Sequence, residues 1–265
     1  MTNKMELEFH KYQGAGNDFI IVDNRNGLNL ELNTEQVKKL CDRKYGIGAD
    51  GLMLLNDKAG YDFEMIYYNA DGNLGSMCGN GGRCMVKFAE SLGILKDVYL
   101  FTAADGDHEA RITPDGIVSL KMNDVDDINN FHGDYTLNTG SPHYIKLVPQ
   151  LATLDVYKKG KEIRYSKDFE KEGINVNFVE QLDEPDKIFV RTYERGVENE
   201  TLSCGTGVTA AAIVFYHNEN GFNEVEVKTL GGWLNVEYDR LEDGKFRNVY
   251  LVGPAEKVFS GSVEI

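Results

Sequence analysis

The chain has 265 residues, of which 42% are hydrophobic and 27% are charged, and its formal net charge is −15. This composition is ordinary for a globular protein, and at roughly 150 residues per domain the length predicts two domains. The acidic balance argues against a nucleic-acid partner, because phosphate binding needs a basic surface. The four cysteines, Cys41, Cys78, Cys84 and Cys204, are too few for a disulfide scaffold at this length.

The N-terminus carries no apolar segment typical of a signal peptide. The longest apolar run, Ala210 to Tyr216, is far too short to span a membrane. We therefore expect no membrane partner and a cytoplasmic location. In that reducing environment a cysteine is more often catalytic or inert than bridged.

Residue periodicity predicts the elements of the first half in chain order. Strands are expected at residues 7–9, 19–22, 51–55 and 63–68, with a turn at 14–16 between the first two. An amphipathic helix is expected from Thr34, whose side chain can cap it, to Cys41. A second helix is expected at 85–92, ended by Gly93. Short strands follow, joined by turns at Asp105-Gly106 and Asp115-Gly116.

The second half repeats the first at a nearly constant offset. Cys78-Gly79-Asn80-Gly81 recurs as Cys204-Gly205-Thr206-Gly207, an offset of 204 − 78 = 126 residues. The same offset relates Gly14 to Gly140, Phe63 to Phe189 and Tyr67 to Tyr193. Chance does not readily produce such a register. We therefore predict two copies of one unit, at 1–123 and 124–253, with the tail at 254–265 returning as a strand to the N-terminal copy.

The segment 207–216 is apolar almost all round, which predicts a helix buried on every side. Short strands and hairpin signals outnumber the helices. We therefore predict an α+β fold of two similar, pseudo-symmetric domains. In each domain a mostly antiparallel or mixed sheet closes around a central helix.

Cys78 and Cys204 each precede a Gly-x-Gly sequence at the expected start of a buried helix. Unpaired backbone N–H groups and the helix dipole favour negative charge there and lower the pKa of a thiol. The same N–H groups can hold a carboxylate. Two such sites, one per copy, could remove a proton from one face of a carbon and deliver a proton to the opposite face.

The other two cysteines are expected to be inert core residues. Cys41 lies on the apolar face of its predicted helix, and Lys167 stands at the matching position of the second half. Cys84 is matched by Ala210. Duplication did not keep either thiol.

The sequence supports neither a metal nor a cofactor. Residues 46–51 match G-x-G-x-x-G, but the predicted helix precedes them and the strand follows, which reverses the order of a dinucleotide site. The histidines and cysteines lack zinc-ligand spacing. No lysine has a context that singles it out for a Schiff base.

The sequence resembles diaminopimelate epimerases over its whole length. The matching stretches, in order, are Gly14-Ala15-Gly16-Asn17-Asp18-Phe19, Tyr68-Asn69-Ala70-Asp71-Gly72, Cys78-Gly79-Asn80-Gly81-Gly82-Arg83-Cys84, Gly140-Ser141-Pro142-His143, Asn175-Val176-Asn177-Phe178, Tyr193-Glu194-Arg195-Gly196 and Cys204-Gly205-Thr206-Gly207. The resemblance implies the two-domain fold above. It also implies a cofactor-independent, two-base epimerisation of LL-2,6-diaminopimelate to the meso form, a step toward lysine and peptidoglycan.

The resemblance further implies roles at the reacting carbon. Cys78 and Cys204 would be the catalytic thiolate and thiol. The backbone amides of Gly79-Asn80 and Gly205-Thr206 would hold the carboxylate next to that carbon. His143, which stands 126 residues after Asn17, would lie near the catalytic pair.

The distal, non-reacting end of the substrate would be bound, by the same resemblance, by Asn17, Asn69, Asn175 and Arg195. Glu194 would hold the ammonium groups. This chain departs from many members of the family at two positions: Ser141 replaces an asparagine and Gly51 replaces a glutamine. Ser141 falls in the substrate-contacting part of its motif.

Other functions remain open at this point. They are a different amino-acid racemase of the same fold, such as a proline or hydroxyproline epimerase, a thiol redox switch, and a non-catalytic amino-acid-binding module. Arg195 and the asparagines favour a small amino-acid substrate with a second charged end. The sequence does not decide the oligomeric state, and a homodimer is compatible with it.

Overall fold

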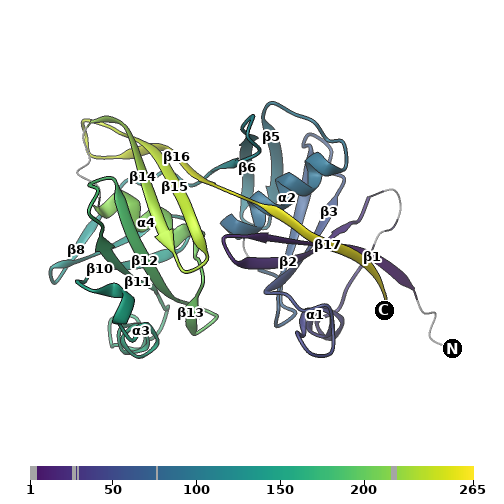
Figure 1. The fold of residues 1–265 in the computed structure, drawn as a ribbon, viewed down its shortest axis with the longest axis horizontal. Helices are drawn as coiled ribbons and strands as arrows, with labels where there is room; N and C mark the ends of the chain where they lie inside the picture. The colour runs from purple at the N-terminus through teal and green to yellow at the C-terminus, as the bar shows by residue number, and fades with distance from the viewer. Residues whose placement is uncertain (1–4, 26–27, 29, 76, 216–219) are drawn as a thin grey trace. The chain divides into compact units, whose positions relative to one another are not determined.

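The computed structural model describes residues 5–25, 28, 30–75, 77–215 and 220–265. The chain divides into two compact units. Unit 1 runs to Leu120 and includes the C-terminal segment Pro254–Ile265, and unit 2 is Lys121–Gly253. In each unit a set of strands surrounds one helix, α2 or α4 (Figure 1). The predicted sheet-dominated α+β fold is confirmed.

Unit 1 is built mainly from antiparallel strands. Its elements are β1 (Glu6–Gly14), β2 (Asn17–Asp23), α1 (Thr34–Cys41), β3 (Gly51–Asn56), β4 (Phe63–Asn69), α2 (Gly79–Ser91), β5 (Tyr99–Ala103), β6 (Gly106–Ile112), β7 (Val118–Lys121) and β17 (Glu256–Glu264). The pairs β2–β3 and β4–β5 are parallel. The C-terminal strand β17 lies antiparallel to β1, so the end of the chain completes this sheet.

Unit 2 follows a similar order of elements, with the short elements β8, η1 and β13 added. Its elements are β8 (Asn129–Phe131), β9 (Asp134–Asn138), β10 (Pro142–Leu147), the short 3-10 helix η1 (Leu151–Thr153), α3 (Val156–Arg164), β11 (Asn175–Gln181), β12 (Lys187–Glu194), β13 (Asn199–Thr201), α4 (Gly205–Phe215), β14 (Gly221–Thr229), β15 (Gly232–Arg240) and β16 (Phe246–Gly253). Tyr216, the predicted end of α4, lies outside the described residues.

The repeat extends to strand register. In the parallel pair β2–β3, Phe19 lies opposite Gly51. In the pair β10–β11, Ile145 lies opposite Asn177. Each partner in unit 2 is 126 residues beyond its counterpart, since 145 − 19 and 177 − 51 both equal 126. Residues 126 positions apart in the sequence therefore occupy equivalent places in the strand pairing of the two units.

The two central helices are buried for most of their length. α2 begins at Gly79, six residues before the predicted start, because the glycines after Cys78 are helical. A Cβ on Gly82 would lie 3.1 Å from Leu120, so a larger residue would crowd the packed strand. In α4 every residue from Gly207 to Ile213 is buried. Within the described residues, no helix is both long enough and apolar enough to cross a membrane.

The cap of α1 differs from the sequence prediction. The cap is Asn33, not Thr34. The Asn33 Oδ1 accepts from the Gln36 backbone N–H at 3.0 Å, and the Gln36 Oε1 accepts from the Asn33 N–H at 3.0 Å. This reciprocal capping box satisfies two N–H groups that a helix end leaves unpaired. Thr34 instead becomes the first helical residue.

Replacing Asn33→Ala should lower the free energy of unfolding by about 1 kcal/mol, because it removes the cap acceptor. The matched change Thr34→Ala should leave it nearly unchanged, since that side chain does not cap the helix. Urea denaturation of both variants measures the difference. A larger loss in Thr34→Ala than in Asn33→Ala would contradict this assignment.

Candidate functional site

Cys78 and Cys204 occupy equivalent places at the starts of α2 and α4. Cys78 is the N-cap residue of α2, with extended backbone, and its carbonyl accepts from the Gly82 N–H at 2.7 Å. The Cys204 carbonyl accepts from the Val208 N–H at 2.8 Å, just before α4. In each unit, a thiol therefore lies next to the N–H groups in the first turn of a buried helix. The helix dipole favours an anion at that place.

The half-buried Cys78 is joined to two asparagines. Its Sγ donates to the Asn17 Oδ1 at 3.5 Å, and the Asn80 Nδ2 donates to the same oxygen at 3.4 Å. The Asn17 Nδ2 donates to the Asp50 Oδ2 at 2.6 Å. A carboxylate can only accept, so Asp50 fixes the amide of Asn17 with its oxygen toward the thiol.

Asp50 belongs to a compact charge network behind Asn17. The Arg43 guanidinium lies 2.7 Å from Asp50 and 2.6 Å from Asp18, and the Lys11 Nζ lies 2.7 Å from Asp18. Burial alone would raise the pKa of Asp18, but the hydrogen bonds from Arg43 and Lys11 outweigh it and hold the pKa at about 2. Two cations and two carboxylates thus neutralise one another.

Cys204 is buried beside a threonine of its own helix. Its Sγ lies 3.6 Å from the Thr206 Oγ1. The Thr139 hydroxyl donates to the Thr206 carbonyl at 2.9 Å, which ties the end of β9 to the start of α4. The first turn of α4 is therefore held by the segment that follows β9 as well as by its own hydrogen bonds.

His143 is fully buried on β10 and is held in one tautomer. The Asn177 Nδ2 lies 3.0 Å from the His143 Nδ1 and also donates to the Tyr144 carbonyl. The Thr192 hydroxyl donates to the Asn177 Oδ1, so the Asn177 nitrogen is the donor and the proton of His143 sits on Nε2. Burial, aided by the charge of Arg195, lowers the pKa of His143 to about 3. The imidazole is therefore neutral at physiological pH.

Arg195, Asn175 and Ser141 form a hydrogen-bonded group in unit 2. The Asn175 Nδ2 donates to the Ser141 Oγ at 3.0 Å, and the Arg195 Nη2 donates to the same oxygen at 3.2 Å. The Arg195 backbone N–H donates to the Asn175 Oδ1 at 2.8 Å. A third bond runs from the Arg195 Nη1 to the Glu172 carbonyl. The exposed guanidinium is thus fixed in direction.

The other two predicted residues lie at strand ends. Asn69 is exposed at the end of β4, where its carbonyl accepts from Gly72 in a turn. Glu194 ends β12, and its Oε2 accepts from the Thr201 hydroxyl at 2.8 Å. The structure brings Asn17, Asn80 and Cys78 together in unit 1. It brings Asn175 and Arg195 together with Ser141 in unit 2.

Sequence reasoning assigned no role to Asp50, Arg43 or Lys11. Charged side chains outside an apolar stripe are usually solvated, so no local signal singled them out. Lys11 lies on β1, Asp18 on β2, and the other two in the segment between α1 and β3. Only the pairing of these strands brings the four side chains together behind Asn17.

The space beside Gly51 is occupied by a neighbouring aromatic ring. A Cβ at this position would lie 2.5 Å from the Tyr67 ring and 2.7 Å from the Tyr68 carbonyl oxygen. The Tyr67 ring also closes over Gly75. The Tyr67 ring can therefore occupy this position only because residue 51 has no side chain.

Cys41 and Cys84 lie in the core, as the sequence predicted. Burial raises the pKa of the Cys41 thiol to about 12 and that of Cys84 still further. Both thiols therefore stay protonated at neutral pH. Among the described residues there is no group of three or more His, Cys, Asp or Glu side chains placed to hold a metal ion.

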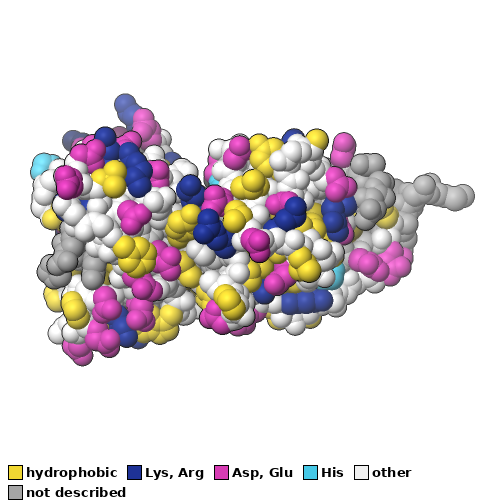
Figure 2. Space-filling model, turned by 90° about the horizontal axis from the view of Figure 1, so that it is seen from above, with side chains coloured by type: hydrophobic (Ala, Val, Ile, Leu, Met, Phe, Trp, Pro, Cys, Tyr) yellow, Lys and Arg dark blue, Asp and Glu magenta, His cyan; other side chains and the backbone are white. Residues whose placement is uncertain are grey.

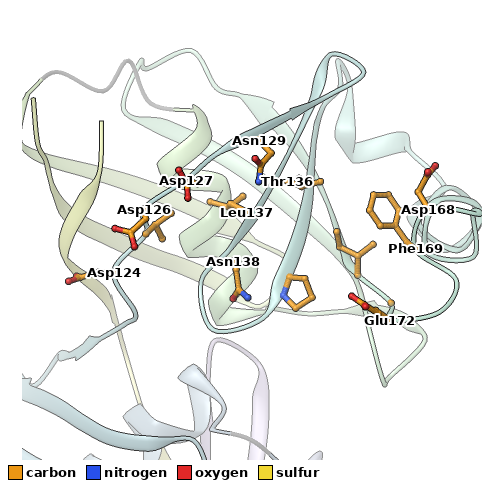
Figure 3. Close-up of a pocket in the computed structure, with 14 residues that line it drawn as sticks. Asp124, Asp126, Asp127, Asn129, Thr136, Leu137, Asn138, Asp168, Phe169 and Glu172 are labelled. Atoms are coloured by element: carbon orange, nitrogen blue, oxygen red, sulfur yellow. The ribbon is translucent and has the colours of Figure 1, made fainter. Parts of the chain in front are cut away.

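An open hollow of about 580 Å³ lies elsewhere in unit 2. Its walls include Asp126, Asp127 and Glu172 (Figure 3), and none of the predicted site residues lines it. Such an acidic lining disfavours a ligand with two carboxylates. Over the face in Figure 2, acidic and basic side chains are interspersed.

Comparison with known proteins identifies relatives along nearly the whole chain. The family model described as diaminopimelate epimerase matches residues 9–126 and 135–258. A diaminopimelate epimerase of Flavobacterium psychrophilum is 48% identical over 259 residues, covering 97% of this chain and 100% of the relative. One of Chlorobaculum tepidum is 43% identical, covering 95% of this chain and 99% of the relative.

Solved structures of lower identity share the fold. A phenazine biosynthesis protein of the PhzF family from Bacillus anthracis superposes with a TM-score of 0.77 at 15% identity, covering 98% of this chain and 100% of that one. A hydroxyproline epimerase from Agrobacterium vitis gives 0.69 at 13% identity, covering 100% and 94%. At these identities the likeness concerns the fold alone.

Introducing a methyl group by Gly51→Ala should destabilise the protein by about 1–3 kcal/mol, because the Cβ overlaps the Tyr67 ring and the Tyr68 carbonyl. Thermal unfolding measures the loss. The control is Gly81→Ala, whose added Cβ would lie no closer than 3.2 Å to any neighbour. This variant should lose less stability than Gly51→Ala. Equal losses in the two variants would argue against the coupling to Tyr67.

The raised pKa values of Cys41 and Cys84 make these thiols unreactive below their titration range, because only the thiolate is nucleophilic. Iodoacetamide at pH 8 should leave both unmodified in the native protein. In urea at the same pH, both should be alkylated as readily as the other cysteines. Peptide mass spectrometry measures each site, and rapid native labelling of either residue would contradict its place in the core.

Proposed function

Because this chain belongs to the diaminopimelate epimerase family, we propose that it epimerises LL-2,6-diaminopimelate to the meso form, with Cys78 and Cys204 as its acid–base pair. The observation that carries the proposal is the pair of thiols at equivalent helix N-termini, in a repeat that keeps both sequence offset and strand register. Named relatives at 48% and 43% identity support the substrate.

The reaction is a one-proton exchange at the α-carbon. One cysteine, as thiolate, takes the α-proton, so a C–H bond breaks and an S–H bond forms. The other cysteine, as thiol, gives its proton to the opposite face of the same carbon. Electron density left on the carbon passes into the adjacent carboxylate. The N–H groups at Gly79-Asn80 and Gly205-Thr206 stabilise that charge, since they are fixed before the reaction starts.

In the proposal, the distal end of the substrate is bound by the protein but takes no part in the reaction. In the proposal, the Arg195 guanidinium pairs with the distal carboxylate, since its direction is fixed by Ser141 and by the Glu172 carbonyl. Asn17, Asn69 and Asn175 offer amide groups, and the Glu194 carboxylate suits an ammonium group. A second charged end distinguishes this substrate from proline or hydroxyproline.

Every chemical step in this scheme uses side chains and backbone of the chain itself. The scheme requires both thiols in reduced form. That requirement supports a cytoplasmic location, where thiols are kept reduced.

Removing either acid–base thiol should abolish epimerisation. In Cys78→Ala and in Cys204→Ala we expect a loss of at least about a hundredfold in kcat/KM, the usual scale for a positioned acid or base. The assay follows LL-to-meso conversion and uptake of solvent deuterium at the α-carbon. Cys41→Ala is the matched control and should keep near-normal activity, because that thiol lies in the core of unit 1.

Full activity in either single variant would overturn the two-base assignment. Binding of diaminopimelate by the wild-type protein without any deuterium uptake would identify a binding module instead. Turnover of proline or hydroxyproline in place of diaminopimelate would assign the chain to another racemase activity.

Ser141→Ala should raise KM for LL-diaminopimelate about tenfold with little change in kcat. The change removes the acceptor that fixes the Arg195 Nη2, and a hydrogen bond to a charged group contributes about 1.5–3 kcal/mol. Steady-state kinetics separate the two constants. Ser166→Ala is a control for loss of a hydroxyl elsewhere in unit 2. A fall in kcat with unchanged KM would place Ser141 at the reacting end instead.

A further inference from the structure

Arg83 is a fully buried cation in the first turns of α2. Its Nη2 donates to the Asn80 Oδ1 at 3.0 Å, and its Nη1 lies 3.4 Å from the Gly79 carbonyl. Its buried Nε has no hydrogen-bond partner among the described residues. No carboxylate of the described chain lies within ion-pairing distance of it. A buried charge without a counter-ion strongly destabilises a folded protein.

The neighbouring charges do not balance Arg83. Lys11 on β1 and Arg43 are paired with Asp18 on β2 and with Asp50, so that network is neutral by itself. Further along, β1 presents His10 to the Phe88 ring of α2, where burial lowers the pKa of His10 and keeps it neutral.

The remaining elements against α2 add no counter-charge. On α2 itself, the Lys87 ammonium is paired with Glu90. On β6, Arg111 is paired with Glu109, and His108 lies against Asp105. The strand β17 carries Glu256, which accepts from Gln13. None of these described carboxylates lies within ion-pairing distance of the buried Arg83 guanidinium.

Two thiols remain as possible counter-ions of Arg83. Burial lowers the pKa of Arg83 to about 10, and a negative charge on Cys84 or Cys78 would oppose that fall. Side chains also link Arg83 to Cys78, because Asn80 accepts from Arg83 and donates to the Asn17 oxygen that the Cys78 thiol contacts. Cys84 is fully buried, and its thiol stays protonated because burial raises its pKa. Cys78 is half-buried at the N-cap, where an anion also meets the helix dipole. A thiolate at Cys78 would therefore compensate both the Arg83 charge and the positive end of the helix dipole.

Among the described residues of unit 2, no lysine or arginine is buried in this way. The residue matching Arg83 is Thr209, since 209 − 83 = 126. The Thr209 hydroxyl donates to the Gly205 carbonyl at 3.0 Å, and Arg83 approaches the matching Gly79 carbonyl. Both side chains thus donate to the equivalent backbone carbonyl in the first turn of their helix. Only Arg83 adds a positive charge.

We propose that Arg83 is a positioning residue that acts as the buried counter-charge of the Cys78 thiolate. Cys78 is therefore the cysteine that ionises first, and Cys204 is the partner that holds its proton. This inference rests on the proposed function in one respect: the charge matters for turnover only if the two thiols act as a pair. Duplication kept both thiols but made their electrostatic surroundings unequal.

The test compares Arg83→Met, which keeps the volume and removes the charge, with Arg83→Lys, which keeps the charge. Thr209→Val is the matched control, because it removes the equivalent hydrogen bond without removing a charge. Two pH profiles are measured on the full chain: iodoacetamide labelling of Cys78 and Cys204 by peptide mass spectrometry, and kcat/KM for LL-diaminopimelate.

In Arg83→Met the midpoint of Cys78 labelling and the acid limb of kcat/KM should move to higher pH by about one unit or more, the usual effect of losing a neighbouring opposite charge. Arg83→Lys should restore part of the shift. The Cys204 midpoint should move in neither Arg83→Met nor Thr209→Val. Thermal unfolding of Arg83→Met should be unchanged or raised, because it removes an uncompensated buried charge.

An unshifted Cys78 midpoint in folded Arg83→Met would overturn the proposal, as would an equal shift at Cys204. Should Arg83→Met fail to fold, the labelling profiles of the wild-type protein still test the proposal. The pH midpoint for labelling of Cys78 should lie below that for Cys204, and the reverse order would overturn the proposal. The labelling profiles need no substrate. They therefore test Arg83 even if the epimerase assay fails.

Discussion

The burial of α2 and α4 is the constraint on which the rest of the structure depends. A helix surrounded by strands cannot slide or turn without breaking its packing, so its first turn is held at one place in each unit. The N–H groups of that turn have no partner within the helix. Contacts from outside, such as the hydrogen bond from Thr139 to the Thr206 carbonyl, hold the turn in unit 2. Rigid N–H groups can stabilise negative charge without first reorganising.

Different polar side chains are held in place near the starts of α2 and α4. In unit 1 the Asp50 carboxylate fixes the amide of Asn17, and Asn17 turns its oxygen to Cys78. In unit 2, Asn177 fixes the tautomer of His143, which burial keeps neutral. Although Asn17 and His143 occupy matching positions, they offer different chemistry. The duplicated backbone therefore carries a buried cation, Arg83, on α2 and a neutral threonine, Thr209, at the matching position of α4.

This inequality suits a reaction in which two groups of one chemical kind act in opposite senses. If both thiols had the same surroundings, their first ionisation would be shared between them. A counter-charge beside one thiol separates the two protonation states, and the protonated partner then has a proton to give. In unit 2, the Ser141 hydroxyl oxygen accepts from both Asn175 and Arg195, so one side chain orients two others.

The sequence by itself determined the repeat, the sheet-dominated α+β class, most strands, and the two Cys-Gly-x-Gly turns. These features are local or periodic, and an offset of 126 residues is visible without coordinates. It missed the cap at Asn33 by one residue, because Asn33 and Thr34 are both good caps and only the backbone shows which one lies outside the helix. Tertiary structure alone decided the network of Lys11, Asp18, Arg43 and Asp50, the fit of Tyr67 against Gly51, and the burial of Arg83. Each of these depends on side chains that strand pairing brings together from distant parts of the chain, and no local pattern encodes that proximity.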